Sequence, residues 1–211
     1  MVRSKHVAII IQSLSIGGAE KQALMLADGL ASTSNFQITL VTLETTELQW
    51  NQYERHPHIT TLLAPYRHTA SRLGKLLVLL RVLFFFRQLK ADVLIPFTYY
   101  PNLFSSLLWK LSGAKAGFWN QRDLGVHFVV DRITQLALKC PTAFISNSDG
   151  GKYFLKSQLK KITKPIYVIK NGIKIDESIL LKSLPVGNQF KLVMVGNLHK
   201  NKDHITLIRA W

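Results

Sequence analysis

Short apolar runs alternate with helix-like patterns along most of the 211 residues, and this alternation limits the fold more than any other feature. The runs are rich in β-branched residues, which is typical of strands, whereas the segments between them place apolar residues at i, i+3 and i+4. Strands that alternate with helices favour a doubly wound α/β domain with a parallel sheet. We predict strands at 7–11, 37–43, 59–63, 92–97, 116–123, 142–146 and 165–169, and helices at 23–31, 72–90, 101–111, 128–139 and 149–159.

Two adjacent glycines, Gly17 and Gly18, stand between the first predicted strand and the first helix. Without Cβ atoms, this turn can adopt positive φ and let another molecule approach the backbone closely. The first N–H groups of the helix are unpaired and carry partial positive charge, so the position suits a phosphate or a sugar diphosphate. The glycines also fit a tight turn that binds nothing, and both interpretations stay open.

Polar residues follow the carboxyl ends of several predicted strands, where doubly wound sheets bind their ligands. Asn120, Arg122 and Asp123 end the fifth strand, although Arg122 and Asp123 also fit a simple surface pair. Ser148 follows the sixth strand and is expected to cap the next helix. The Asn171-Gly172 pair after the seventh strand is typical of a tight turn.

The formal charge of +15 fits three kinds of partner: nucleic acid, an anionic membrane surface, or an anionic small substrate. The sequence has no zinc-finger spacing and no aromatic RNA-binding signature, so we expect no nucleic acid partner. His56 and His58 lack an evident third ligand, so we expect no metal site. The single cysteine, Cys140, excludes an internal disulfide and fits a reducing compartment.

The segment 72–90 predicts a helix that is apolar around almost its whole circumference. At about 100° per residue, four cations fall on one side of this helix and Arg81 falls opposite. One apolar face must cover the sheet. The other fits either burial by neighbouring helices or peripheral docking on an anionic membrane. The four cations on the first side are Arg72, Lys75, Arg87 and Lys90.

The pattern changes after the seventh strand. Residues 176–188 form a polar, Pro- and Gly-containing stretch that indicates a linker, and a new strand is expected at 190–196 with a helix from 205. One strand and a short helix cannot bury their own apolar faces. We therefore expect a first domain over 1–175, the linker at 176–188, and the truncated start of a second domain at 189–211.

Four loop motifs occur in order and together span nearly the whole chain. They are Gly17-Gly18-Ala19-Glu20, Asn147-Ser148, Val168 to Ile173, and Val195-Gly196-Asn197-Leu198 with Lys202, His204, Leu207-Ile208 and Ala210. In this combination the sequence resembles glycosyltransferase family 4. The resemblance implies a GT-B architecture, in which two Rossmann-like domains face each other across a cleft. This chain would be the first lobe of that architecture, a doubly wound Rossmann-like sheet, followed by a truncated second lobe.

The resemblance implies an enzyme that transfers a sugar from a nucleotide-sugar donor to an acceptor hydroxyl with retained anomeric configuration, generally without a metal. It implies a cytoplasmic enzyme that acts on a polysaccharide or lipid-linked glycan, at the inner membrane face if the helix at 72–90 docks there. By similarity, Gly17 and Gly18 approach the donor diphosphate and the acceptor, and Gly196 and Lys202 approach the donor phosphates. A fixed ammonium there would stabilise the leaving diphosphate. Lys202 alone would also fit a solvated loop lysine.

The sequence departs from the family pattern at two positions. Asn197 stands where family members often carry arginine, so one phosphate contact loses its charge. A histidine near the end of strand five is replaced by Asn120 or Arg122, and Asn171 is a further candidate for binding substrate. The family's two-glutamate motif is not in the sequence, so we expect this piece by itself to be inactive.

Other functions remain to be separated from this one. A sugar-nucleotide epimerase shares the architecture and also holds a nucleoside diphosphate between two domains. A non-catalytic basic module that binds membrane or nucleic acid also fits the charge. A nicotinamide-dependent oxidoreductase is disfavoured, because Gly17-Gly18 lacks a spaced third glycine and no acidic residue is convincingly placed for a ribose.

Overall fold

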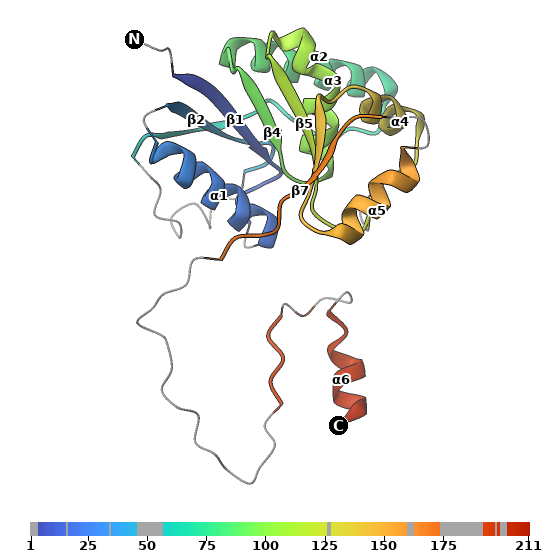
Figure 1. The fold of residues 1–211 in the computed structure, drawn as a ribbon. Helices are drawn as coiled ribbons and strands as arrows, with labels where there is room; N and C mark the ends of the chain where they lie inside the picture. Colours follow the sequence, from blue (N-terminus) through green and yellow to red (C-terminus); the bar gives the residue numbers. More distant parts are fainter. Residues whose placement is uncertain are drawn as a thin grey trace. The chain divides into compact units, whose positions relative to one another are not determined.

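The computed structural model of the protein describes residues 4–15, 17–33, 35–45, 57–125, 128–159, 163–173, 192–196, 198 and 202–211. The chain divides into two units, Met1–Gly172 and Ile173–Trp211. The first unit carries the sheet and the second carries helix α6 (His204–Ala210) (Figure 1).

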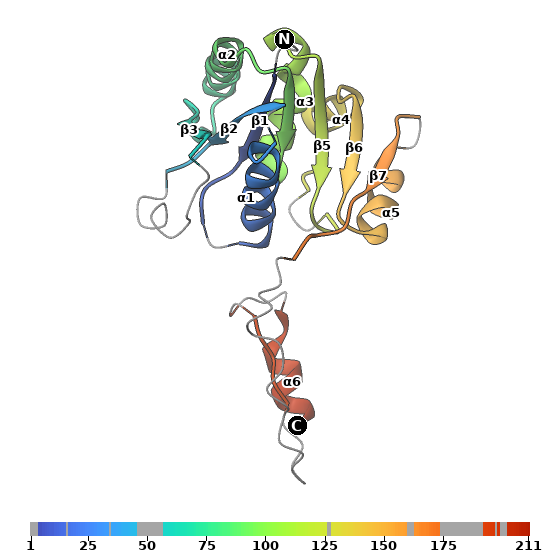
Figure 2. The same cartoon turned by 60° about the vertical axis from the view of Figure 1, so that its left-hand side comes forward.

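The first unit is built on a seven-stranded parallel sheet with the order β3-β2-β1-β4-β5-β6-β7 (Figure 2). This architecture confirms the predicted doubly wound α/β fold, and each predicted strand in the first unit is present. Neighbouring strands pair in parallel throughout. The strands are β1 (Lys5–Ile11), β2 (Phe36–Thr42), β3 (Ile59–Leu63), β4 (Val93–Pro96), β5 (Ala116–Gln121), β6 (Ala143–Ser146) and β7 (Ile166–Val168).

Strand β1 is apolar on both faces because helices cover the sheet from both sides. Ile9 and Ile11 pack in one cluster with helix α1 (Gly18–Ala31). Ala8 and Ile10 pack in another cluster with α2 (Arg72–Leu89) and α3 (Tyr99–Ser112). A third cluster joins β5 and β6 to α4 (Arg132–Lys139) and α5 (Asp149–Gln158).

The strand order reverses direction at β1. The chain proceeds from β1 outward through β2 and β3, and then returns to place β4 on the other side of β1. The loops that leave the carboxyl ends of β1 and β4 therefore diverge. In open α/β sheets such a switch point is where a crevice forms for ligands.

The helix predicted at 128–139 begins only at Arg132, so its first turn was predicted wrongly. The Asp131 side chain accepts a hydrogen bond from the backbone N–H of Thr134 (2.7 Å) and fixes the helix start there. Phe128 instead packs against the rings of Phe154 and Trp119, at centroid distances of 5.1 and 6.1 Å. This packing holds residues 128–131 in a non-helical path.

Two smaller predictions have opposite outcomes. Ser148 caps α5 as expected, because its Oγ accepts from the backbone N–H of Gly151 (3.1 Å). The tight turn at Asn171-Gly172 is wrong, since residues 169–173 form no turn. The N–H of Gly172 donates to Oε1 of Gln22 (2.9 Å), and its carbonyl accepts from Nε2 of Gln22 (2.7 Å). A side chain of α1 thus holds this segment straight.

In the second unit the predicted helix is confirmed as α6, but residues 192–196 form no strand. A strand needs a neighbour to take up its backbone hydrogen bonds, and no described residue of this unit pairs with 192–196. The predicted linker at 176–188 and the candidate residue Asn197 lie outside the described residues.

Candidate functional site

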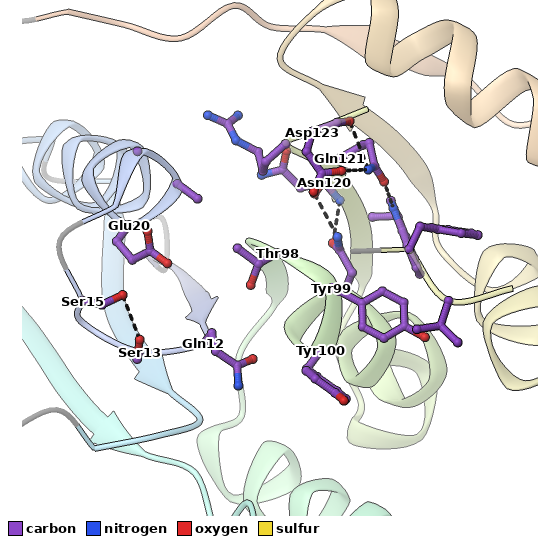
Figure 3. Close-up of a pocket in the computed structure, with 17 residues that line it drawn as sticks. Gln12, Ser13, Ser15, Glu20, Thr98, Tyr99, Tyr100, Asn120, Gln121 and Asp123 are labelled. Atoms are coloured by element: carbon purple, nitrogen blue, oxygen red, sulfur yellow. Dashed lines mark hydrogen bonds between the residues drawn. The ribbon is translucent and has the colours of Figure 1, made fainter. Parts of the chain in front are cut away.

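A cavity of about 660 Å³ opens at the switch point of the first unit, beyond the carboxyl ends of β1, β4 and β5. Three groups of residues line it. They are Gln12, Ser13, Ser15, Gly18, Ala19 and Glu20 after β1; Thr98, Tyr99, Tyr100 and Asn102 after β4; and Trp119, Asn120, Gln121, Arg122, Asp123, Phe128 and Val129 in and after β5. Figure 3 shows Ser15 and Glu20 facing Asn120 and Asp123 across the space, with Thr98 between them.

Two buried asparagines fix the wall between β5 and α3. Oδ1 of Asn102 accepts from the backbone N–H of Asn120 (2.7 Å), and Nδ2 of Asn102 donates to the Asn120 carbonyl (2.9 Å). Both side chains are 2% exposed. Because one amide satisfies both backbone groups, the end of β5 is locked to the start of α3.

The cavity wall also carries buried polar atoms that have no hydrogen-bond partner. They are Oγ1 of Thr98, Oδ1 of Asn120 and Nε of Arg122. Thr98 is further strained, since its φ of 74° is a conformation that a β-branched residue rarely adopts. Unpaired buried groups cost about 1–3 kcal/mol each. Strain and unpaired groups on one cavity wall are typical of a ligand site.

Arg122 is the cation of the cavity wall. Its guanidinium lies 5.1 Å from the centre of the Phe97 ring and donates through Nη2 to Oδ1 of Asn171 (2.5 Å). Burial lowers the pKa of Arg122 from its usual value. The alternative surface pair with Asp123 is not formed, because Asp123 accepts from Gln121 (2.7 Å) and from Gly125 N–H (2.8 Å). Arg122 therefore keeps donor capacity at the cavity.

Asp123 also holds the loop after β5 in place. Gln121 links Nε1 of Trp119 (3.0 Å) to Asp123, so the hydrogen bonds run from the core to the loop. Gly125 has φ of 89°, and a Cβ there would collide with the Phe154 ring. The loop thus needs a glycine for both its backbone and its packing.

Glu20 covers the glycine pair that the sequence suggested as an anion site. The expected turn with positive φ is not formed there, because Gly17 is extended (φ −144°) and Gly18 already begins α1. A Cβ on Gly17 would collide with Oε2 of Glu20, so the bare glycine makes room for this carboxylate. Glu20 lies in the first turn of α1, where a negative charge is favourable. Burial raises the pKa of Glu20, and a hydrogen bond from its own backbone N–H opposes this rise. A phosphate at Gly17 would have to displace Glu20.

The structure brings together several of the residues predicted from the sequence. Gly18, Asn120 and Arg122 line one cavity, Asn171 bonds to Arg122, and Gly17 adjoins them beneath Glu20. The lining residues that sequence reasoning did not choose as site residues include Gln12, Ser13, Ser15, Thr98, Tyr99, Tyr100 and Asn102, and Glu20 was named only as part of a loop motif. Only their position could have indicated them, because they follow the carboxyl ends of β1 and β4.

The second unit places two further predicted residues side by side. A Cβ on Gly196 would stand 3.5 Å from Cγ of Lys202, an ordinary contact. Lys202 is exposed. Whether this pair and Gly17 meet the same diphosphate stays a prediction.

Helix α2 presents an unusual surface on the same unit. Its buried side is Val78, Val82 and Phe86. The opposite side, here called the α2 outer face, consists of Leu73, Leu76, Leu77, Leu80 and Phe84, which are 41–68% exposed. Exposed cations flank this face, and the helix has no acidic residue. Burial of this face by neighbouring helices, one of the two alternatives, is not found for these five residues.

Two absences concern the described residues only. None of their helices combines the length and apolar composition needed to cross a bilayer. No three His, Cys, Asp or Glu side chains within the described ranges are grouped so as to hold a metal ion.

No protein-family model and no curated protein sequence matches the chain. Solved structures share its fold. HepE from Anabaena, in complex with UDP and glucose, matches with a TM-score of 0.59 and 15% identity over 79% of this chain and 44% of that chain. WaaB, a lipopolysaccharide outer core galactosyltransferase, matches with 0.58 and 16% over 81% and 47%.

A UDP-N-acetylglucosamine 2-epimerase matches with a TM-score of 0.52 and 13% identity over 81% of this chain and 47% of that chain. The chain therefore spans less than half the length of each of these three proteins. At such identities the similarity shows the fold alone: a Rossmann-like α/β sheet of the kind that forms one lobe of GT-B proteins.

Proposed function

We propose that the protein is a glycosyltransferase that moves a sugar from a nucleotide-sugar donor to an acceptor hydroxyl. The observation that carries this proposal is the polar, strained cavity at the switch point of a sheet that has the fold of one GT-B lobe. HepE, which shares this fold, binds UDP and UDP-glucose. Because the chain spans less than half of such proteins, the activity is proposed for the whole protein.

The loop motifs favour glycosyltransferase family 4, and with it transfer that retains the anomeric configuration and needs no metal. In this proposal residues 1–175 form the acceptor-side domain, 176–188 the linker, and 189–211 the start of the donor-binding domain. The acceptor hydroxyl attacks the anomeric carbon, the bond to the nucleoside diphosphate breaks, and the hydroxyl proton leaves with the diphosphate. Negative charge builds on the leaving phosphate.

Lys202 is our candidate catalytic residue for that step. Its ammonium would stabilise the leaving diphosphate electrostatically, with the backbone at Gly196 close to the same phosphates. The closeness of the Lys202 side chain to Gly196, where an added Cβ would stand 3.5 Å from Cγ, supports this assignment. Asn197 would contribute a neutral hydrogen bond there.

In the first unit, Gly17 and Gly18 would approach the diphosphate and the acceptor once the Glu20 carboxylate has moved. Asn120 and Arg122 would contact the transferred sugar or the acceptor, and Asn171 would orient Arg122. The unpaired Nε of Arg122 and Oδ1 of Asn120 support this role, because sugar hydroxyls both donate and accept hydrogen bonds.

The α2 outer face supports a location at the cytoplasmic face of a membrane, with a polysaccharide or a lipid-linked glycan as acceptor. Exposed leucines and a phenylalanine can enter the lipid boundary while the flanking cations meet anionic headgroups. Each cation near such a surface contributes about 1 kcal/mol.

The test uses the protein encoded by the complete reading frame, incubated with UDP-, GDP- and ADP-sugars and a lipid extract as acceptor. We expect acceptor-dependent release of one nucleoside diphosphate and a glycosylated product detected by mass spectrometry. Replacement of Lys202 by alanine should lower kcat/KM by about 10²–10³, as for loss of one electrostatic contact in a transition state. Unchanged kinetics would remove Lys202 from the phosphate site.

The second candidate is a sugar-nucleotide epimerase, favoured by the epimerase among the proteins of this fold. An epimerase would change the configuration of the nucleotide-sugar without any acceptor, so the same assay without lipid extract separates the two. Absence of both reactions, together with vesicle binding, would favour the non-catalytic membrane module.

A further inference from the structure

An aromatic shelf adjoins the cavity on the side of β2 and β3. Tyr66 and His68 come from the segment after β3, and their rings lie 6.0 and 6.4 Å from the ring of Tyr100, which lines the cavity. Phe104 of the core lies 5.6 Å from Tyr66 and anchors it. Tyr100 is 36% exposed and His68 is exposed, so the shelf presents ring surface to solvent.

A carboxylate and an amide border this shelf. Nε2 of Gln12, a cavity residue, donates to Oε1 of Glu44, and the backbone N–H of Glu44 donates to the Gln12 carbonyl (2.8 Å). Burial, together with smaller contributions from the charges of Tyr100 and Glu44, raises the pKa of Tyr66 to about 12. The Tyr66 phenol is thus a neutral hydrogen-bond donor and acceptor on the shelf.

The composition of this surface fits one chemical class of ligand. A sugar ring has an apolar C–H face, which packs on an aromatic ring, and a rim of hydroxyls, which bind carboxylate, amide and phenol groups. The carboxylate of Glu44 would repel an acidic sugar or a phosphate. The shelf therefore favours a sugar without charge, even though the whole chain carries +15.

We propose that Tyr66, His68 and Tyr100, with Glu44 and Gln12, form a subsite for an uncharged sugar ring of the acceptor. The part of this inference that makes the sugar an acceptor rests on the proposed function. The binding of a neutral sugar can be measured without turnover. Arg67 lies between Tyr66 and His68 in the sequence and is exposed. Its replacement by alanine is therefore a matched control, because it changes an exposed side chain of the same segment that is not part of the proposed subsite.

The experiment titrates the 211-residue protein with methyl glycosides of glucose, galactose and mannose, and with methyl glucuronide as the charged comparison. Binding is followed by saturation-transfer NMR and quantified by chemical-shift titration. We expect at least one neutral glycoside to bind with a Kd of about 1–10 mM, and methyl glucuronide to bind at least about tenfold more weakly. No neutral binding, or a glucuronide that binds as well, would overturn the subsite.

Variants locate the binding. Tyr100→Ala should weaken the neutral glycoside by at least about tenfold, Tyr100→Phe should keep most of the affinity because the ring remains, and Arg67→Ala should change nothing. Glu44→Gln should reduce the difference in Kd between the neutral glycosides and methyl glucuronide. Equal affinity in Tyr100→Ala and the parent protein, with both folded by circular dichroism, would contradict the proposal.

The outcomes separate this subsite from the proposed enzyme. Neutral glycosides that bind at the shelf, in a complete protein that transfers no sugar, would leave the subsite standing and remove the glycosyltransferase. A complete protein that transfers sugar equally well in its Tyr100→Ala form, and binds no neutral glycoside, would remove the subsite alone.

Discussion

The α2 outer face and the cavity wall belong to the same unit and to the same strongly basic chain, yet they have opposite chemistry. The outer face is apolar, flanked by cations, and built on a helix without an acidic residue. The cavity holds Glu20 and Asp123, adjoins Glu44, and has Arg122 as the cation on its wall. Net charge therefore says little about what each surface binds, because Glu20, Asp123 and Glu44, three of the twelve carboxylate side chains, lie at or beside this one cavity.

The largest effect is expected from substitutions that make the α2 outer face polar. In the double variant Leu76→Glu, Leu80→Glu, binding to vesicles of phosphatidylglycerol and phosphatidylcholine should fall by at least about a hundredfold, since each buried leucine contributes about 1.5–3 kcal/mol and each new charge is repelled. Cosedimentation measures this. Leu136→Glu on α4, also exposed, is the matched control and should bind as the parent does. Equal partitioning of the parent with and without anionic lipid would refute the surface.

The next effect breaks the cavity wall. Asn102→Ala leaves the buried N–H and carbonyl of Asn120 unpaired, and we expect the free energy of unfolding to fall by about 2–4 kcal/mol. Urea denaturation followed by circular dichroism measures the change. Ser157→Ala on α5, an exposed serine, should lower stability by less than about 0.5 kcal/mol. Similar denaturation midpoints for the two variants would show that the hydrogen bonds from Asn102 to Asn120 do not stabilise the fold.

A smaller effect concerns the support behind the cavity. The start of α5 adjoins the loop after β5, since Nδ2 of Asn147 donates to the Arg122 carbonyl (3.1 Å). Ser148→Ala removes the helix cap and should lower the free energy of unfolding by about 1 kcal/mol. Ser148→Asn should restore most of it, and an asparagine variant as unstable as the alanine variant would argue against capping.

The smallest expected effect concerns how the stability of the fold depends on pH through Glu20. Burial raises the pKa of Glu20, so the folded state holds this proton more tightly than the unfolded chain does. The contribution of Glu20 to stability is therefore greatest at acidic pH and declines as pH rises through the interval between the usual and the raised pKa. Glu20→Gln should thus gain stability relative to the parent as pH rises above the usual glutamate pKa in urea titrations. The opposite trend would show a Glu20 that is better stabilised as an anion.

The sequence predicted the strands well because most are short, β-branched runs buried on both faces, as Ile9, Ile10 and Ile11 show. It predicted the first turn of α4 wrongly because the apolar pattern at Phe128 came from packing on Trp119 and Phe154, not from a helix. It also predicted a turn at Gly172, where a distant α1 side chain, Gln22, holds the chain straight.

The candidate site was found in part for a similar reason. Asn120 and Arg122 could be chosen because they end a strand, and Gly18 because it begins a helix. Thr98 and Tyr100 also follow a strand, but their importance depends on the position of β4 beside β1, which no local pattern encodes. The contact between Gln12 and Glu44 likewise joins two loops from adjacent strands.

By itself the sequence determined the alternation of strands and helices and the helix cap at Ser148, because these depend on neighbours a few residues away. Only the tertiary structure decided the strand order, and with it the switch point that gathers β1, β4 and β5 around one cavity. It also decided that the α2 outer face stays exposed. These follow from contacts between residues far apart in the chain, whose free energies no local pattern contains.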